Sequence, residues 1–159
     1  IEIMSLSLNL FFIIFFYFIG SIPFALLIPK FFGHGDIRNI GSGNVGATNV
    51  LRTGNKYLAL SILCLDILKG FLPFIILSTI FEDTQLLLVA FLCHFCILGH
   101  IFPIWLKFKG GKGVATYIGF LFGINLFLGF YFIILWLAIA LISRYSSLSS
   151  IIASSIAPI

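Results

Sequence analysis

Charge is what this sequence has least of. Charged residues make up 9% of the 159 positions, while 61% are hydrophobic and the mean hydropathy is +1.22. Soluble domains carry roughly 25% charged residues. The apolar runs are also too long to be the inner faces of amphipathic helices. These features exclude a soluble protein and predict one polytopic, all-α integral membrane domain over residues 1–159.

Cysteine is scarce as well, and the three thiols of Cys64, Cys93 and Cys96 all lie inside apolar segments. An odd count fits no disulfide framework, and such thiols behave as small hydrophobes. His94 stands between two of them, but a zinc site needs a more polar ligand set. We therefore predict no metal. The N-terminus also lacks a basic leader and a small-residue cleavage site, so we expect the first apolar run to be a retained span.

Membrane spans need about 20 apolar residues, and such runs cover residues 6–29, 57–81 and 86–106. Residues 114–143 form a longer apolar run, with Asn125 and flanking glycines near its middle. We expect two short segments there, 114–124 and 126–142, with a hairpin or re-entrant break at Asn125. A further span begins near Ser149, which makes about five spans and a partial sixth.

The positions of lysine and arginine predict the sidedness. If the N-terminus, which carries Glu2, is outside, every loop lysine and arginine falls on the cytoplasmic side. The acidic turn of Glu82 and Asp83 then faces outward. Three polar segments share the cytoplasmic face, namely residues 41–55, 107–116 and 144–150.

The first polar segment begins GSGNVGATN. Its glycines permit positive φ, so that successive N–H groups can form an anion-binding nest. A short helix beginning near Ala47 would bring Arg52 one turn past Thr48, next to the same anion. The glycines also spell a dinucleotide fingerprint, but no βαβ unit surrounds them; a flexible linker is the remaining alternative. We expect a phosphate or carboxylate site formed by Gly41, Ser42, Gly43, Gly46, Thr48, Asn49 and Arg52.

The second polar segment, KFKGGKGVAT, places Lys112 among three glycines just before an apolar helix. A loop that leads into a helix N-terminus favours anions. It is not a Walker A loop, because Gly113 occupies the Ser/Thr position. Lys112 is suited to act as a point charge on phosphate oxygens. Lys107 and Lys109 are interpreted as interfacial lysines that extend to the headgroups.

A few polar residues stand inside or beside the spans. Asp66 and Lys69, in LDILKG, are spaced i, i+3 and must face the bundle interior. They hold helices together, support the polar loops, or form part of an ion pathway. His100 is either a general base or a hydrogen-bonded structural residue. Arg144, followed by serines, begins the third polar segment, and an interfacial arginine beside small packing residues is the alternative there.

Taken together, GSGNVGATNVLRTGNK, GHIFPIWLKFKGGKGVAT and RYSSLSS closely resemble, in the same order, motifs of the bacterial acyl-phosphate:glycerol-3-phosphate acyltransferases, the PlsY family. The resemblance covers nearly the whole chain. It implies a seven-helix enzyme of the bacterial cytoplasmic (inner) membrane that moves an acyl group from acyl phosphate to the 1-hydroxyl of sn-glycerol 3-phosphate. Its implied partners are these two substrates, the lipid bilayer and the enzyme that makes acyl phosphate. Acyl-CoA, nucleic acid and cofactors have no implied role.

By this resemblance, Asn44 joins the first motif, the second segment matches a substrate-binding loop, and Arg144 with its serines matches a third region. Acyl phosphate is already activated, so Ser42 is expected to hydrogen-bond and not to attack. Either His100 or a substrate phosphate takes the proton. The candidate catalytic residues are Ser42, Arg52, Lys112 and His100. The candidate substrate-binding residues are Gly41, Gly43, Asn44, Gly46, Thr48, Asn49, Gly110, Gly111, Gly113, Thr116, Arg144 and Ser147, with Asp66 and Lys69 in support.

The sequence departs from the family pattern at its end. Family members continue into a further helix and a basic tail with functional His, Asn and Glu residues, whereas this sequence stops at Ile159. We expect it to lack that helix and tail, so that it is either incomplete or an inactive, lipid-binding homologue. A transporter of an anionic or phosphorylated solute is a further alternative, although no inverted repeat supports it.

Overall fold

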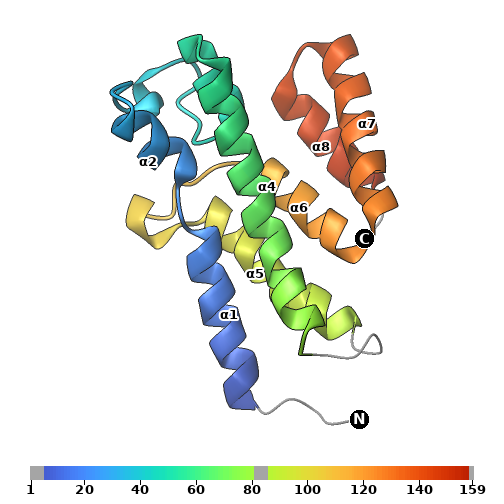
Figure 1. Ribbon diagram of the computed structural model, residues 1–159. Helices are drawn as coiled ribbons and strands as arrows, with labels where there is room; N and C mark the ends of the chain where they lie inside the picture. The colour runs from blue at the N-terminus through green and yellow to red at the C-terminus, as the bar shows by residue number, and fades with distance from the viewer. Residues whose placement is uncertain (1–5, 81–85, 158–159) are drawn as a thin grey trace.

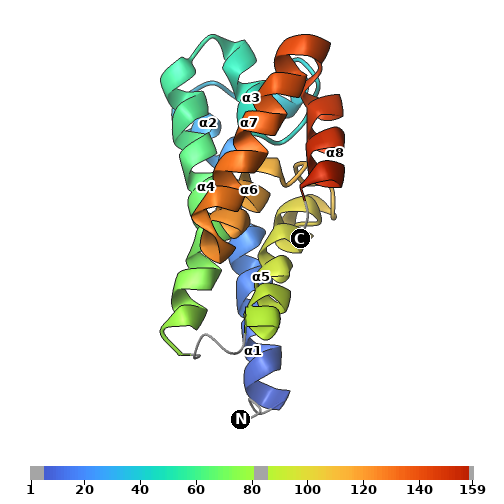
Figure 2. The same cartoon turned by 90° about the vertical axis from the view of Figure 1, so that its right-hand side faces the viewer.

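The computed structural model describes residues 6–80 and 86–157, which form helices joined by loops, with no strand in these two ranges. Glu2, Glu82 and Asp83, on which the sidedness partly rests, lie outside the described residues. Figures 1 and 2 show the helices gathered into one elongated bundle. The elements are α1 (Leu6–Gly20), α2 (Phe24–Phe31), η1 (Ile37–Asn39), α3 (Ala47–Val50), η2 (Leu51–Thr53), α4 (Lys56–Ser78), α5 (Leu86–Ile101), η4 (Ile104–Leu106), α6 (Val114–Ile124), α7 (Leu126–Ser143) and α8 (Ser146–Ile156).

The helix lengths agree with a membrane protein. Three segments are long and apolar enough to cross a bilayer, namely Lys56–Ser78, Leu86–Leu106 and Leu126–Ser143, and the bent pair of α1 and α2 adds a fourth if it counts as one span. α6 and α8 have 11 residues each. At 1.5 Å per residue they are roughly half as long as the ~30 Å hydrocarbon layer. The all-α membrane fold is confirmed, while the expected count of spans stays a prediction.

The first apolar run is not the continuous helix that residues 6–29 suggested. α1 ends at Gly20, and α2 begins at Phe24 after a bend of 40°. Pro23 stands in the break and has no N–H with which to continue the helix. In this break the carbonyl of Ile22 accepts the N–H of Phe24 at 3.1 Å and also accepts a hydrogen bond from Lys69 Nζ at 2.9 Å. The break thus gives Lys69 a backbone acceptor inside the bundle.

The expected break at Asn125 is present. α6 ends at Ile124, and Asn125 adopts an extended conformation before α7 begins. Its side-chain oxygen accepts the N–H of Phe127 at 2.8 Å, which caps the new helix. The thirty-residue apolar run is therefore two helices, and α7 returns along the bundle beside α6 (Figure 1).

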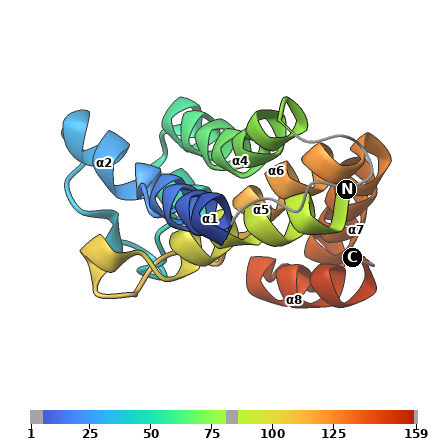
Figure 3. The same ribbon diagram turned by 90° about the horizontal axis from the view of Figure 1, so that it is seen from below.

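Glycines let α4 and α6 cross very closely. Gly70 of α4 faces the carbonyl of Thr116, and Gly119 of α6 faces the carbonyl of Ile67, so a Cβ at either glycine would collide with backbone. α1 and α5 cross through glycines in the same way. α7 is packed more loosely, with 11% of its apolar window buried against 33% for α4. Figure 3 shows α7 and α8 as a flank beside the other helices.

Candidate functional site

The first polar loop folds around the side chain of Asn49, which is buried on α3. Asn49 Oδ1 accepts hydrogen bonds from Ser42 N at 3.1 Å and Ser42 Oγ at 3.3 Å. Asn49 Nδ2 donates to the carbonyl of Ile37 at 2.8 Å. Gly41 and Gly43 have positive φ values of 57° and 69°, which allow the chain to wrap this amide. Asn49 therefore acts as the scaffold of the loop.

Replacing Asn49 with alanine is expected to destabilise the protein by about 1–3 kcal/mol, because the loop loses all three hydrogen bonds of this buried amide. The Ile37 carbonyl then keeps only the N–H of Ile40, at 3.2 Å. Thermal unfolding in detergent, followed by circular dichroism, measures this loss. Asn39→Ala, at an exposed position of η1, is the matched control and should unfold near the wild-type temperature. An equal shift in both variants would contradict the scaffold role of Asn49.

Two arginines lie on this part of the molecule. Arg52 is exposed, and its side chain packs over Gly41. Arg38 pairs with Asp36, whose carboxylate also accepts the backbone N–H of Arg38 at 2.9 Å. These hydrogen bonds lower the pKa of the Asp36 carboxyl to about 2, so the pair stays charged at neutral pH.

The second polar loop is seated between the first loop and the end of α5. The N–H of Gly111 donates to the carbonyl of His100 at 3.1 Å, and Gly110 donates to Ile101 at 3.0 Å. A Cβ at Gly111 would overlap His100 Nε2 and the carbonyl of Val45. Only a glycine fits at this contact, which brings the two predicted anion loops against one another.

The side chain of Lys112 connects this loop to the third polar segment. Its side chain is exposed, and Nζ donates to Ser147 Oγ on α8. Gly113, with φ 77°, immediately precedes α6. Arg144 occupies a left-handed conformation between α7 and α8. All three polar segments are thus linked, as their shared sidedness predicted.

A buried cluster of charged and polar side chains lies beneath the loops. Lys69 Nζ stands 2.8 Å from Asp66 Oδ1, an ionic contact without aligned hydrogen-bond geometry. His100 Nδ1 is 3.7 Å from the same oxygen, which is beyond hydrogen-bonding distance. Because Nε2 of His100 packs on Gly111, both ring nitrogens face protein groups. The predicted pair of Asp66 and Lys69 is formed, and His100 connects it to the second loop.

A basic cavity of about 660 Å³ opens beside the two loops. Lys107 and Phe108 have positive φ values of 52° and 62°, which turn the chain so that Lys107 and Lys109 both line this cavity. Ser42 and Asn44 contribute polar groups. The cationic lining residues are Arg38, Lys107, Lys109 and Lys112.

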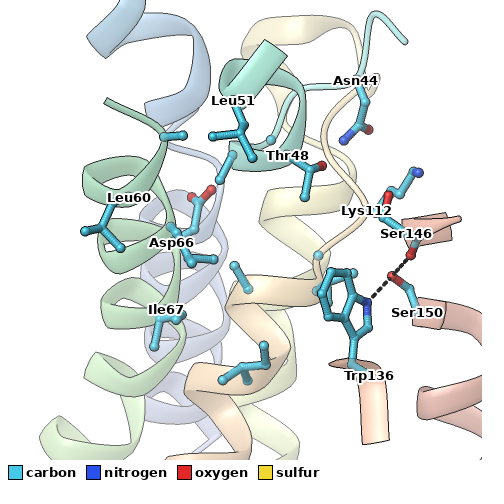
Figure 4. A pocket seen from close by; sticks show the side chains of 18 of the residues that line it. Asn44, Thr48, Leu51, Leu60, Asp66, Ile67, Lys112, Trp136, Ser146 and Ser150 are labelled. Carbon is cyan, nitrogen blue, oxygen red and sulfur yellow. Dashed lines mark hydrogen bonds between the residues drawn. The ribbon is translucent and has the colours of Figure 1, made fainter. Parts of the chain in front are cut away.

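Figure 4 shows a second, apolar cavity of about 440 Å³. It adjoins the basic cavity, because the two have lining residues in common. Its sides come from α4 and α7, and α6 packs between them. Asn44, Val45 and Lys112 line both cavities. The apolar lining is formed by Leu60, Leu63 and Ile67 of α4, Val114, Ala115 and Ile118 of α6, and Ile133, Trp136 and Leu137 of α7.

Ten of the eighteen candidate site residues line these two cavities, and Gly111 and Lys69 are among the eight that do not. Asn44, Gly46, Thr48, His100, Lys112 and Gly113 line the apolar cavity, together with Asp66. Ser42, Gly43, Asn44, Gly110 and Lys112 line the basic one. Gly41, Asn49, Arg52, Arg144 and Ser147 lie outside both linings, and Thr116 is buried in α6 with Oγ1 lacking a hydrogen-bond partner among the described residues.

Comparison with known proteins assigns the chain to a family. The family model described as glycerol-3-phosphate acyltransferase matches residues 10–159. The chain belongs to the glycerol-3-phosphate acyltransferase family. It is therefore an integral membrane enzyme of the acyltransferase class.

Individual acyltransferases agree with this assignment. The chain is 57% identical to a glycerol-3-phosphate acyltransferase of Pelagibacter ubique over 142 residues, which are 89% of this chain and 72% of that protein. It is 51% identical to that of Agrobacterium fabrum over 143 residues, 90% and 68% of the two chains. The crystal structure of PlsY (YgiH) in its glycerol 3-phosphate form superposes with a TM-score of 0.82 at 43% identity, covering 91% of this chain and 72% of that one. The lysophosphatidic acid form gives 0.83 at 41%, covering 94% and 73%.

The structure of this acyltransferase adds residues that the sequence reasoning placed elsewhere. The sequence predicts interfacial roles for Lys107 and Lys109 and counts Arg38 only as one of the loop arginines, yet all three residues line the basic cavity. The sequence did contain a signal for this basic lining, because lysines alternate directly before the glycine loop. The sequence does not single out Trp136, because nothing local in an apolar helix marks the side that lines a cavity, whereas Ser150 belongs to the predicted third polar segment.

Proposed function

We propose that this acyltransferase moves a fatty acyl group from acyl phosphate to the 1-hydroxyl of glycerol 3-phosphate, giving lysophosphatidate and phosphate. The observation that carries the proposal is the pair of adjoining cavities that share Asn44 and Lys112. The reaction joins a small phosphorylated alcohol to a long apolar chain. A basic compartment suits the first, an apolar compartment suits the second, and the reacting carbonyl belongs where they meet.

The chemistry needs alignment and charge stabilisation. The hydroxyl oxygen of glycerol 3-phosphate bonds to the acyl carbonyl carbon, the bond from that carbon to phosphate breaks, and the hydroxyl proton leaves with the phosphate. Because phosphate is a good leaving group, holding the two substrates together supplies much of the rate. Lys112 lies where it can stabilise the charge on the carbonyl and phosphate oxygens. The side chains of Arg38, Lys107 and Lys109 bind the phosphate oxygens in the basic cavity. Several N–H groups of the glycine loops already donate within the protein, among them those of Gly43, Gly110 and Gly111.

The remaining candidate residues take supporting roles in this proposal. The Ser42 hydroxyl donates to Asn49, which favours hydrogen bonding over nucleophilic attack. His100 faces Asp66 and Gly111, which favours the departing phosphate as proton acceptor. Arg52 and Arg144, both exposed, are assigned to attracting anionic substrates to the site.

We further propose that the loops face the cytoplasm of a bacterial inner membrane, with the N-terminus outside. Figure 1 supports this, because the connection from α2 to α4 and the connection from α7 to α8 lie at one end of the bundle, whereas α1 begins at the other. The cytoplasmic side is where a soluble, phosphorylated substrate is available. An enzyme that makes acyl phosphate would then act just before this one.

The donor tests the proposal directly. Membranes containing the chain, given labelled glycerol 3-phosphate, are expected to form labelled lysophosphatidate with acyl phosphate and to release one phosphate for each product. Acyl-CoA at the same concentration should give no product above that of membranes without the chain. Product from acyl-CoA alone, or from neither donor, would overturn the proposal.

A further inference from the structure

The apolar cavity is a trough with lipid-facing rims. Leu60, Leu63 and Ile67 recur along one face of α4, and Ile133, Trp136 and Leu137 recur along one face of α7. At the rims, Leu60 is 56% exposed and Leu137 is 48% exposed. Asn44 and Thr48 stand at one end of the trough and Ile67 at the other (Figure 4). A chain lying along it would have its polar head beside Lys112.

Trp136 is the one aromatic residue among those that line the trough. Its indole N–H donates to Ser150 Oγ at 3.1 Å, and that hydroxyl donates to the carbonyl of Ser146 at 2.7 Å. Figure 4 shows the indole nitrogen directed to Ser150 on α8. This hydrogen-bonded chain holds the ring in one orientation, so its apolar surface is presented to the cavity.

A membrane-interface anchor is the ordinary reason for a tryptophan in an apolar helix. Such residues direct the indole N–H to headgroups and water. Trp136 instead directs it inward to α8, and its side chain is partly buried. The anchoring explanation accounts for neither the hydrogen bond nor the place in the lining.

We infer that Trp136 determines which acyl chains this enzyme accepts, and that Ser150 positions the indole for that purpose. This inference rests on the proposed function, since it takes the trough as the place of the acyl chain. A linear chain packs flat against the ring, whereas a methyl branch at that depth collides with it. One misplaced methyl group in an apolar pocket changes kcat/KM by about tenfold or more.

The first experiment compares linear and methyl-branched acyl phosphates of equal carbon number, with the branch at successive positions. The wild type should discriminate against branches at one depth, and Trp136→Ala should raise the ratio of kcat/KM for that branched donor over the linear one by about tenfold. Phe127→Ala removes an aromatic ring from the lipid-facing side of α7, outside the trough, and should leave the ratio unchanged. Unchanged ratios at every depth in Trp136→Ala would overturn the inference.

A binding measurement is independent of turnover. The sequence contains two tryptophans, so in a Trp105→Phe variant all the tryptophan fluorescence comes from Trp136. Lysophosphatidate with bromine atoms along its chain should quench this fluorescence when the bromines reach the depth of the ring. Ser150→Ala should weaken the quenching and shift the donor ratio in the direction of Trp136→Ala, which distinguishes positioning from general packing.

The outcomes separate the inference from the function beneath it. If the wild type transfers no acyl group from any acyl phosphate, the proposed function fails. If transfer proceeds while the fluorescence of Trp136 is unquenched and the branched-to-linear ratio is constant, only the role of Trp136 fails.

Discussion

Replacing Lys112 with alanine is expected to lower kcat/KM for acyl transfer by about a hundredfold to a thousandfold, the effect of removing one charge-stabilising donor from an active site. Among the described residues, Lys112 is the one cationic residue that lines both cavities, and the proposed mechanism places the reacting carbonyl where they meet. Its side chain is exposed, so the fold should survive the change. The measurement is the initial rate of lysophosphatidate formation, with helicity followed in parallel by circular dichroism.

Three further variants test whether the effect comes from the charge of Lys112, from its partner, or from surface charge in general. Lys112→Arg keeps the charge but changes its shape, so activity should fall between wild type and Lys112→Ala. Ser147→Ala removes the neutral partner of Lys112 and should have a smaller effect. Lys30→Ala removes an exposed lysine of α2 outside both cavities and should leave the rate unchanged. If Lys30→Ala and Lys112→Ala behave alike, Lys112 acts only through general surface charge.

Replacing Asp66 with asparagine is expected to destabilise the protein by about 3–5 kcal/mol, because Lys69 is left as an uncompensated charge inside the bundle. Asp66 is 1% exposed and Lys69 is 4% exposed. The Ile22 carbonyl and the ring of Phe24, 5.4 Å from Nζ, remain near the ammonium but carry no negative charge. Unfolding in a mixed detergent series measures the loss.

The matched comparison is the exposed pair of Asp36 and Arg38. Asp36→Asn should produce a much smaller change, since water screens that pair. A double replacement, Asp66→Leu with Lys69→Met, should recover part of the stability lost by Asp66→Asn, because both charges are then removed together. If the double variant is as unstable as the single one, the packing of these side chains matters more than their charge.

Local patterns in the sequence predicted the local features of the fold. An asparagine with flanking glycines predicted the break at Asn125, and its side chain caps α7. The i, i+3 spacing predicted the contact of Asp66 with Lys69, and the loop pattern predicted a helix that begins at Ala47. Each depends on residues within one or two helical turns. The break between α1 and α2 had a local signal in Pro23, but the apolar run around it outweighed that signal.

The arrangement of the site depends on contacts that no local pattern contains. Lys112 meets Ser147 across 35 positions, and Gly111 meets Val45 from a separate loop. A membrane helix is apolar on every side, so hydropathy does not distinguish the face toward lipid from the face toward protein. The trough, with Trp136 in its wall, therefore became visible only in three dimensions. The roles of the individual site residues stay predictions until the variants are measured.

The close crossing of α4 and α6 also limits how this gene can change. Every single-base change of a glycine codon that replaces glycine with another amino acid adds a side chain. At Gly70 and Gly119 that side chain would meet a backbone carbonyl, which cannot rotate out of the way. At either position, no amino acid that a single-base change can introduce would keep the spacing of the two helices. The lipid-facing leucines, in contrast, can be replaced by other apolar residues through single-base changes. We therefore expect descendants of this protein to vary in sequence over most of the lipid-facing surface but to keep both glycines at this crossing.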